Sequence, residues 1–266
     1  MSLRKKIRRP LQKLLRGVHR ACFTRPLPEK LGVYFHSLDD HELPAFTDAI
    51  RWMKSEGYQF TGAADFLTTP GRTACVSFDD NHEAWFRALP LMESLGVKCT
   101  FFINTCVLRG ECTEAEWAAF TLKVKYFGKD RPLSRGDICA LRDAGHWIGA
   151  HTHTHLALPY FSEEVVEADL RRNLEVLEGI TGGRITDFAF PFGMPRYFPP
   201  RLLPLVKALG FRTMSWATAG MQYAHGGPMQ LQRSPWNCTQ TVEWNVQNLR
   251  VNGKFFVKLT GLSPVG

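Results

Sequence analysis

Two adjacent carboxylates and a cluster of histidines are the residues of this chain best suited to chemistry. Asp79 and Asp80 follow directly on an apolar run, residues 73–78. Ionised carboxylates at the end of a buried strand are costly unless a cation lies beside them. A metal ion is one such cation, and His151 and His155, further along the chain, are matching ligands. The residue types therefore indicate a metal-dependent hydrolase.

The spacing of the histidines supports this interpretation. Two imidazoles four residues apart can fold round one ion at a strand-to-loop turn, and one carboxylate completes a facial set with open coordination positions. Adjacent aspartates of an extended chain point to different sides. One of them could then bind the metal while its neighbour faces the water on that metal. A lone His-x-x-x-His is usually a pair of surface histidines, and the strand-terminal Asp-Asp is what favours metal binding here. His153, between the two ligands, is expected to point away.

Strands and helices alternate along the chain. Expected strands cover residues 31–35, 73–78, 98–103, 146–150, 187–190, 211–216 and 255–259, and expected helices cover 44–56, 83–95, 134–144, 162–180, 200–209 and 240–249. This order predicts an α/β fold with a mainly parallel sheet. In a parallel barrel the carboxyl ends of the strands converge on one face, so polar groups that follow different strands are expected to meet there. Residues 104–132 are expected to be an irregular excursion over the site.

Three sequence motifs carry a family resemblance. Ser-Phe-Asp-Asp-Asn at 77–81 resembles the Thr-Phe-Asp-Asp-Gly motif of polysaccharide deacetylases, the carbohydrate esterase family with the NodB-homology domain. Gly-Ala-His-Thr-His-Thr-His-Leu-Ala-Leu at 149–158 resembles their His-(Ser/Thr)-x-x-His motif. Phe-Ala-Phe-Pro-Phe-Gly at 188–193 is similar to the Phe-Ala-Tyr-Pro-Tyr-Gly form of their third motif. The resemblance spans roughly residues 32–233.

The resemblance implies a distorted (β/α) barrel of the NodB type and a divalent metal, usually zinc. It assigns metal binding to three residues: Asp80, His151 and His155. Asp79 would be the general base, Thr152 would support the histidine loop, and the backbone N–H of Phe192 in Pro191-Phe192-Gly193 would help to stabilise the oxyanion. The implied reaction removes an acetyl group, most often N-acetyl, from a sugar or polysaccharide precursor, as in exopolysaccharide biosynthesis.

The chain departs from the family pattern in two places. The late motif that usually carries the catalytic-acid histidine has none in residues 255–260. His36, at the end of the first expected strand, resembles the rotated motif order of biofilm poly-N-acetylglucosamine deacetylases and is assigned as the general acid, with His225 as the alternative. The arginine that usually pairs with the base is also missing, because its place falls at Ala189. Arg233 is the candidate replacement.

Charge is concentrated at the N-terminus. The chain has 266 residues, with 33 Lys and Arg against 25 Asp and Glu. Residues 1–28 form a basic tail without an acid, and residues 29–266 are expected to be the catalytic domain. Helical spacing of leucines in the tail fits an amphipathic anchor on an anionic membrane, although a solvated terminus fits equally well. The rest of the chain shows no basic stripe and no recognisable nucleic-acid-binding motif, which argues against a nucleic-acid partner.

Cysteine usage and the absence of a secretion signal predict the compartment. The seven cysteines are scattered and form no Cys-x-x-Cys pair, so free thiols in a reducing compartment are expected. No apolar stretch of the signal-peptide kind follows the basic start, and no segment is long enough to span a membrane. The expected location is cytoplasmic, with the tail as a means of peripheral attachment to the inner face of the membrane.

Two other functions stay open on the sequence alone. The first is a metal-dependent enzyme that hydrolyses a different bond, such as an amidohydrolase or deformylase acting on a substrate other than a polysaccharide. The second is a non-catalytic glycan-binding protein, because the late histidine and the third-motif arginine are missing from their usual places.

Overall fold

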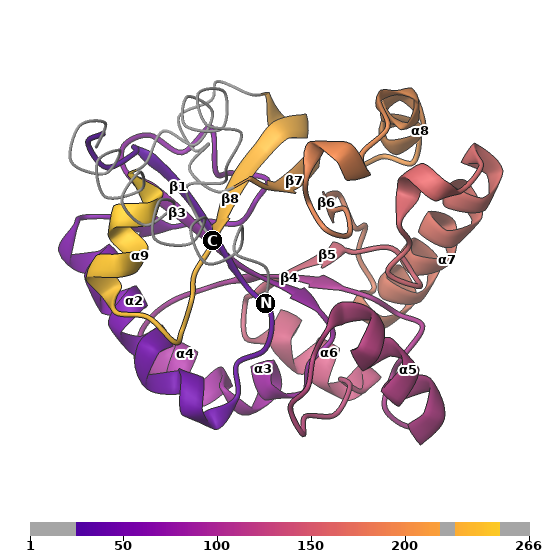
Figure 1. The fold of residues 1–266 in the computed structure, drawn as a ribbon, viewed down its shortest axis with the longest axis horizontal. Coiled ribbons are helices and arrows are strands. Elements are labelled where there is room, and N and C mark those ends of the chain that lie inside the picture. Colours follow the sequence, from indigo (N-terminus) through magenta and orange to yellow (C-terminus); the bar gives the residue numbers. More distant parts are fainter. Residues whose placement is uncertain (1–24, 219–226, 251–266) are drawn as a thin grey trace, which may run out of the picture.

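A closed barrel of parallel strands forms the centre of the molecule, and the helices lie around it (Figure 1). The computed structural model describes residues 25–218 and 227–250. Its strands are β1 (Lys30–Phe35), β2 (Gln59–Phe60), β3 (Thr73–Asp80), β4 (Thr100–Ile103), β5 (Trp147–Ala150), β6 (Asp187–Ala189), β7 (Thr213–Ala217) and β8 (Leu231–Pro235). Its α-helices are α2 (Leu43–Ser55), α3 (Ala84–Arg87), α4 (Leu89–Ser94), α5 (Glu114–Val124), α6 (Arg135–Asp143), α7 (Glu163–Thr181), α8 (Leu203–Ala208) and α9 (Val242–Leu249).

Seven strands close the barrel in the order β1-β8-β7-β6-β5-β4-β3, and β1 pairs again with β3. The short β2 pairs only with the start of β3. All of these pairings are parallel. The predicted distorted (β/α) barrel is therefore confirmed.

Side chains alternate between the two faces of the barrel wall, as the two-residue period of a strand requires. On β3, Val76 and Phe78 belong to the large apolar core shared with the helices, whereas Cys75 faces a smaller inner cluster. On β4, Phe101 stacks on Phe78 in the outer core and Phe102 joins the inner cluster. The outer core holds the helices on the barrel, and the inner face is left for the polar groups of the site.

Two helical predictions need correction. Residues 83–95 were expected to form one helix, but α3 ends at Arg87 and α4 starts at Leu89. Pro90 lies in the first turn of α4, where its missing N–H is tolerated, and it would clash inside a continuous helix. Residues 104–132 were expected to be irregular, yet they contain α5. A capping box between Thr113 and Glu116 starts this helix and is visible in the sequence as Thr-x-x-Glu.

The strand that closes the barrel was also missed in the sequence analysis. β8 (Leu231–Pro235) was not predicted, and it completes the barrel between β7 and β1. Its low apolar content hides it, because one of its inward positions is taken by Arg233 and not by an apolar residue. The predicted strand at 255–259 and the alternative acid His225 lie outside the described residues.

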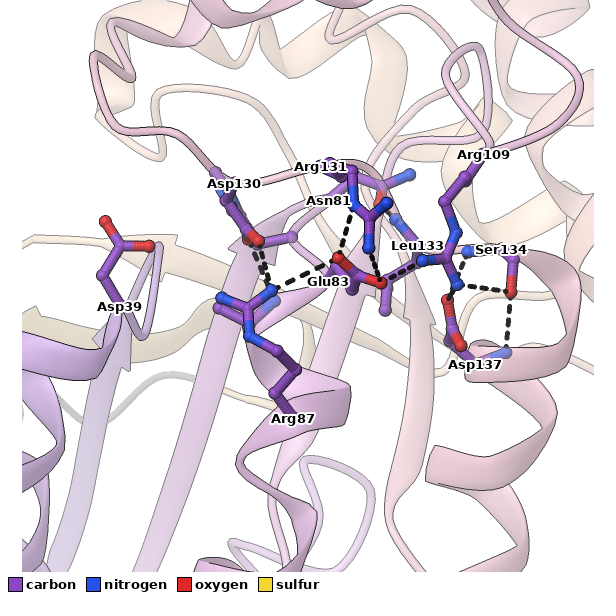
Figure 2. Close-up of polar contacts among 12 residues, drawn as sticks. Asp39, Asn81, Glu83, Arg87, Arg109, Asp130, Arg131, Leu133, Ser134 and Asp137 are labelled. Atoms are coloured by element: carbon purple, nitrogen blue, oxygen red, sulfur yellow. Dashed lines mark hydrogen bonds and ion pairs between the residues drawn. The ribbon is translucent and has the colours of Figure 1, made fainter.

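A network of ion pairs fastens the excursion that contains α5 to the residues just after β3 (Figure 2). Glu83 is almost fully buried and pairs with Arg87 at 3.3 Å, with Arg131 at 3.0 Å and with Arg109. Arg87 also binds Asp130 at 2.8 Å. Because Arg109 precedes α5 and Arg131 follows it, a single carboxylate holds both ends of the excursion.

Three predictions about the whole chain can be compared with the described residues only in part. Six cysteines of the described residues are free thiols, as expected. None of the helices in the described ranges combines the length and the apolar character needed to cross a membrane. The tail helix falls in residues 1–24, outside the described residues, so the division into tail and catalytic domain stays a prediction.

Candidate metal centre

Asp80, His151 and His155 converge at the carboxyl ends of the strands. Each offers one ligand atom, and these atoms all lie within 4.8 Å of one another. The Nε2 atoms of His151 and His155 lie 3.6 and 3.4 Å from Asp80 Oδ1. All three side chains are buried. The structure therefore brings together the three residues that the sequence analysis assigned to the metal.

The hydrogen bond of His151 fits a metal site. His151 Nδ1 donates to the carbonyl oxygen of Ala189 at 2.6 Å, which leaves Nε2 with its lone pair toward Asp80. Such a second bond fixes the tautomer and orientation of a metal-ligating histidine. Among the described residues the buried His155 Nδ1 has no partner. Two imidazole nitrogens and one carboxylate oxygen, with open positions beside them, form a donor set suited to zinc.

The electrostatics favour the ligand form of Asp80 and His155 but the protonated form of His151. Burial raises the pKa of Asp80, but the three neighbouring histidines outweigh it and hold the pKa well below its usual range. Burial lowers the pKa of His155 to about 4, so this imidazole is neutral near pH 7. For His151 burial also lowers the pKa, but the carboxylates of Asp80 and Asp79 outweigh this effect and raise it.

Unusual backbone conformations cluster at this site. In the described part of the chain, the non-glycine residues with positive φ are Asp80 (87°), Lys125 (61°), Thr152 (63°), His155 (53°) and Phe192 (66°). Four of them line one pocket, and Thr152 lies inside the histidine loop. Such conformations cost free energy and persist where the surrounding structure enforces them, commonly at functional sites.

Asp80 shows what this strain achieves. Neighbouring residues of a regular strand face opposite sides, and the two aspartates were expected to do so. The positive φ of Asp80 departs from strand geometry, and both carboxylates line the same pocket.

Asp79 is held by a buried arginine. Arg233 Nη1 donates to Asp79 Oδ1 at 2.6 Å and Nη2 donates to Oδ2 at 3.0 Å. The same Nη1 also donates to Ser77 Oγ at 2.8 Å. Arg233 is 1% exposed, and its guanidinium lies over the rings of Phe102 and Tyr34, 4.9 and 5.1 Å from their centroids. A guanidinium from β8 thus contacts the carboxylate that the sequence analysis paired with it.

The histidine loop is braced from within and from α7. Thr152 Oγ1 accepts from the N–H of Leu156 at 3.0 Å. His153 points away from the ligands, because its Nδ1 lies 2.8 Å from Thr105 Oγ1. Asp169 on α7 accepts from the backbone N–H of His153 at 2.6 Å. No motif or spacing identifies Asp169 or Thr105 in the sequence, since their role depends on which elements pack beside the loop.

The third motif forms a tight turn at the pocket. The N–H of Gly193 donates to the carbonyl of Phe190 at 3.2 Å, and Pro191 with the positive φ of Phe192 gives the arrangement of a type II turn. A Cβ on Gly193 would lie 2.2 Å from the Cβ of Ala217, so only glycine fits. The N–H of Phe192 makes no hydrogen bond to a described residue, and its ring packs on His155 at 4.9 Å.

The pocket over these groups has a volume of about 130 Å³. His36 lines it from the end of β1, exposed to solvent, and its ring contacts Tyr34 at 5.4 Å. Tyr34 and His36 also line a neighbouring hollow of about 290 Å³. Sequence reasoning missed five lining residues: Tyr34, Lys123, Val124, Lys125 and Ala217. Burial and the nearby Asp79 raise the pKa of Tyr34 to about 12, so its hydroxyl stays protonated.

Comparison with known families decides the classification of the chain. The family model described as polysaccharide deacetylase matches residues 67–214, which include all three motifs. The chain belongs to the polysaccharide deacetylase family. Removal of acetyl groups from a polysaccharide-type substrate is therefore its class of reaction, and the resemblance read from the motifs is confirmed.

Solved structures share the fold of this polysaccharide deacetylase. The deacetylase PplD of Streptococcus pyogenes, solved with acetate, has a TM-score of 0.63 at 16% identity, covering 84% of this chain and 99% of its own. IcaB from Ammonifex degensii has a TM-score of 0.63 at 18% identity, covering 84% and 98%. A de-N-acetylase from Aggregatibacter actinomycetemcomitans has a TM-score of 0.59 at 14% identity, covering 85% and 98%. A comparison with curated proteins gave no significant match.

Proposed function

We propose that this deacetylase is a metal-dependent hydrolase that removes N-acetyl groups from a sugar or polysaccharide precursor. Asp80, His151 and His155 would hold a divalent ion, which we propose to be zinc. The observation that carries the proposal is the convergence of these ligand atoms within 4.8 Å in a pocket that Asp79 and His36 also line. When bound, a divalent ion acts as a Lewis acid on the attacking water and on the acyl oxygen.

Asp79 would accept the proton of the attacking water. A general base must be fixed within hydrogen-bond reach of the proton that it removes. The two parallel hydrogen bonds from Arg233 fix the plane of the Asp79 carboxylate, and this rigidity supports the role. Both groups are buried, which shields their interaction from solvent.

Two further groups would act on the acyl carbon and the leaving group. The N–H of Phe192 lacks a described partner at the pocket wall and is a candidate donor to the oxyanion. His36 lies at the solvent-facing side of the same pocket, where it could give a proton to the departing nitrogen. An amine leaves readily only after it is protonated, so a placed acid supports N-deacetylation over O-deacetylation.

Acetate release tests the proposal directly. The purified chain is stripped with a chelator, reconstituted with zinc or another divalent ion, and assayed on a panel of N-acetylated and O-acetylated glycans. We expect turnover on the N-acetylated members only with metal. The variant His155→Gln is expected to lose both metal and activity, whereas His153→Gln, two residues away and turned from the site, should keep both.

Three results would contradict the proposal. Activity that survives complete metal removal excludes the metal role. Hydrolysis of non-sugar amides or formyl groups in place of the glycans favours the wider amidohydrolase activity. Glycan binding without turnover under any divalent ion favours a non-catalytic protein.

A further inference from the structure

The last turn of α5 passes across the mouth of the pocket. Lys123 Nζ donates to the carbonyl oxygen of Thr154 at 2.9 Å, in the histidine loop. Three residues later the hydroxyl of Tyr126 donates to the carboxylate of Asp39 at 3.0 Å, close to the end of β1. The segment between these anchors lines the pocket. We refer to residues 123–126 as the strap.

The strap is fixed independently of any substrate. The N–H of Asp130 donates to the hydroxyl of Tyr126 at 3.0 Å. Asp130 in turn binds Arg87, and Arg131 binds Glu83, within the ion-pair network shown in Figure 2. The position of the strap over the pocket is therefore a property of the folded chain.

Lys125 holds a conformation that its side chain makes costly. It is the C-cap of α5, with φ 61° and ψ 34° in the left-handed region. Helices usually place glycine or asparagine at a left-handed end, because a larger side chain is disfavoured there. The side chain of Lys125 is exposed at the pocket and forms no hydrogen bond or ion pair with a described residue. Two backbone hydrogen bonds close the end of α5 here, from the N–H of Lys125 to the carbonyl of Leu122 at 3.3 Å and from the N–H of Tyr126 to the carbonyl of Thr121 at 2.9 Å. The fold therefore enforces this conformation beside the pocket, as is common at functional sites.

The charge balance of the pocket indicates what Lys125 could bind. Asp79 is already neutralised by Arg233, and Asp80 is the other carboxylate of the lining. Lys123 and Lys125 add two positive charges at the mouth, so the described ionisable groups give a net positive pocket before any divalent ion is counted. A cleft of one sign of charge concentrates ligands of the opposite sign.

We propose that Lys125 binds an anionic group of the acetylated sugar, a carboxylate or a phosphate, and thereby selects anionic acetylated glycans as substrates. The inference rests on the proposed deacetylase function and names the substrate class of the same site. An ammonium group on a flexible stem acts as a point charge and suits either anion.

The test compares three forms of one N-acetylated disaccharide: uncharged, carrying a carboxylate, and carrying a phosphate. We expect the zinc-loaded enzyme to prefer at least one anionic form, and the preferred form identifies the anion. Lys125→Gly is expected to lower the ratio of kcat/KM for that form to kcat/KM for the uncharged form by about five- to tenfold, mainly through KM. Lys125→Arg should keep the ratio near that of the unmodified enzyme, and added salt should reduce it.

Two controls separate binding from folding. Lys129→Gly removes an exposed charge outside the pocket lining and is expected to leave the substrate ratio unchanged. Lys125→Gly is expected to match or exceed the melting temperature of the unmodified enzyme, because glycine relieves the left-handed cap. A loss of anionic preference therefore cannot come from unfolding.

The outcomes also separate this inference from the proposed function. No preference of the unmodified enzyme for either anion, or an equal loss on all three substrates in Lys125→Gly, overturns the role of Lys125 while deacetylation stands. No acetate from any of the three forms with any divalent ion overturns the proposed function and this inference with it.

Discussion

Two neighbouring aspartates acquire different properties from their partners. Asp79 faces a guanidinium through two hydrogen bonds, whereas Asp80 faces two imidazoles. An arginine fixes the plane of a carboxylate through two hydrogen bonds. A carboxylate beside imidazoles with free lone pairs can bind a cation together with them. Two identical side chains that are adjacent in the sequence are therefore suited to different roles, and their contacts decide which role each one has.

Arg233→Lys tests the arginine contact at the level of single atoms. Lysine keeps the charge, but one ammonium cannot replace both hydrogen bonds to Asp79 and the bond to Ser77. We expect kcat to fall by about 10- to 100-fold while the metal stays bound, as is typical when a residue that orients a functional group is changed. Steady-state kinetics with metal analysis of the same sample checks this, and an unchanged kcat would show that Asp79 needs no orientation.

His36→Ala tests the proton donor. We expect N-deacetylation to fall by about 10²- to 10⁴-fold, the usual range for loss of a general acid. Hydrolysis of an activated aryl acetate should be much less affected, because a phenolate leaves without a proton. Asp79→Asn is the matched comparison and should lose both reactions. Equal losses on both substrates in His36→Ala would rule out His36 as the acid.

At the scale of elements, the excursion between β4 and α6 shapes the site. α5 and the strap lie over the pocket, and Glu83 secures both ends of this excursion through Arg109 and Arg131. The buried carboxylate with its several arginines acts as one connected unit (Figure 2). Its position just three residues after Asp80 links the stability of the excursion to the strand that carries Asp80.

Glu83→Gln should weaken this connection. Removing the charge takes the ion-pair partner from Arg131, whereas Arg87 keeps Asp130 and Arg109 keeps Asp137. Because the arginines are partly exposed and can be solvated, we expect a loss of about 2 kcal/mol in the free energy of unfolding. Arg131→Gln should cost less than about 1 kcal/mol, because the Arg131 side chain is 65% exposed. Urea denaturation measures both. In Glu83→Gln we also expect faster proteolysis within residues 104–133. Equal stability of the two variants would contradict the role of Glu83 in holding the excursion.

For the whole molecule, closure of the barrel is what assembles the site. Arg233 on β8 reaches Asp79 on β3 through the interior of the barrel, and β1 lies between these two strands in the wall. The residues that line the pocket come from six parts of the chain that are separated in sequence. A closed parallel barrel presents the carboxyl ends of all its strands on one side.

The global stability should depend on pH through a histidine outside the site. Burial, helped by the charge of Lys98, lowers the pKa of His146 from 6.5 to about 4, and its Nδ1 accepts the N–H of Cys99 at 3.0 Å. Between these pKa values the unfolded chain binds more protons than the folded one. The contribution of His146 is therefore complete above pH 6.5 and is lost as the pH falls toward 4, by up to about 3 kcal/mol.

His146→Asn isolates this contribution. Asparagine keeps an acceptor and cannot be protonated, so unfolding stability should fall less steeply between pH 6.5 and pH 4 than in the unmodified chain. Denaturation curves at several pH values, with a chelator present, measure the difference. His41→Asn, which changes an exposed histidine, should leave the slope unchanged. Parallel pH profiles for His146→Asn and the unmodified chain would exclude the effect.

The sequence by itself determined the parts of the protein that depend on local pattern. Alternating apolar segments specify a parallel α/β barrel, and short motifs mark Asp79, Asp80 and the histidine loop, because strand ends and metal ligands require particular residue types at fixed spacing. The tertiary structure alone decided the rest. Arg233 lies on an unpredicted strand, the strap crosses the pocket, and the positive φ of Asp80 turns both aspartates to one side. These features arise from contacts between segments far apart in the chain, which no local pattern encodes.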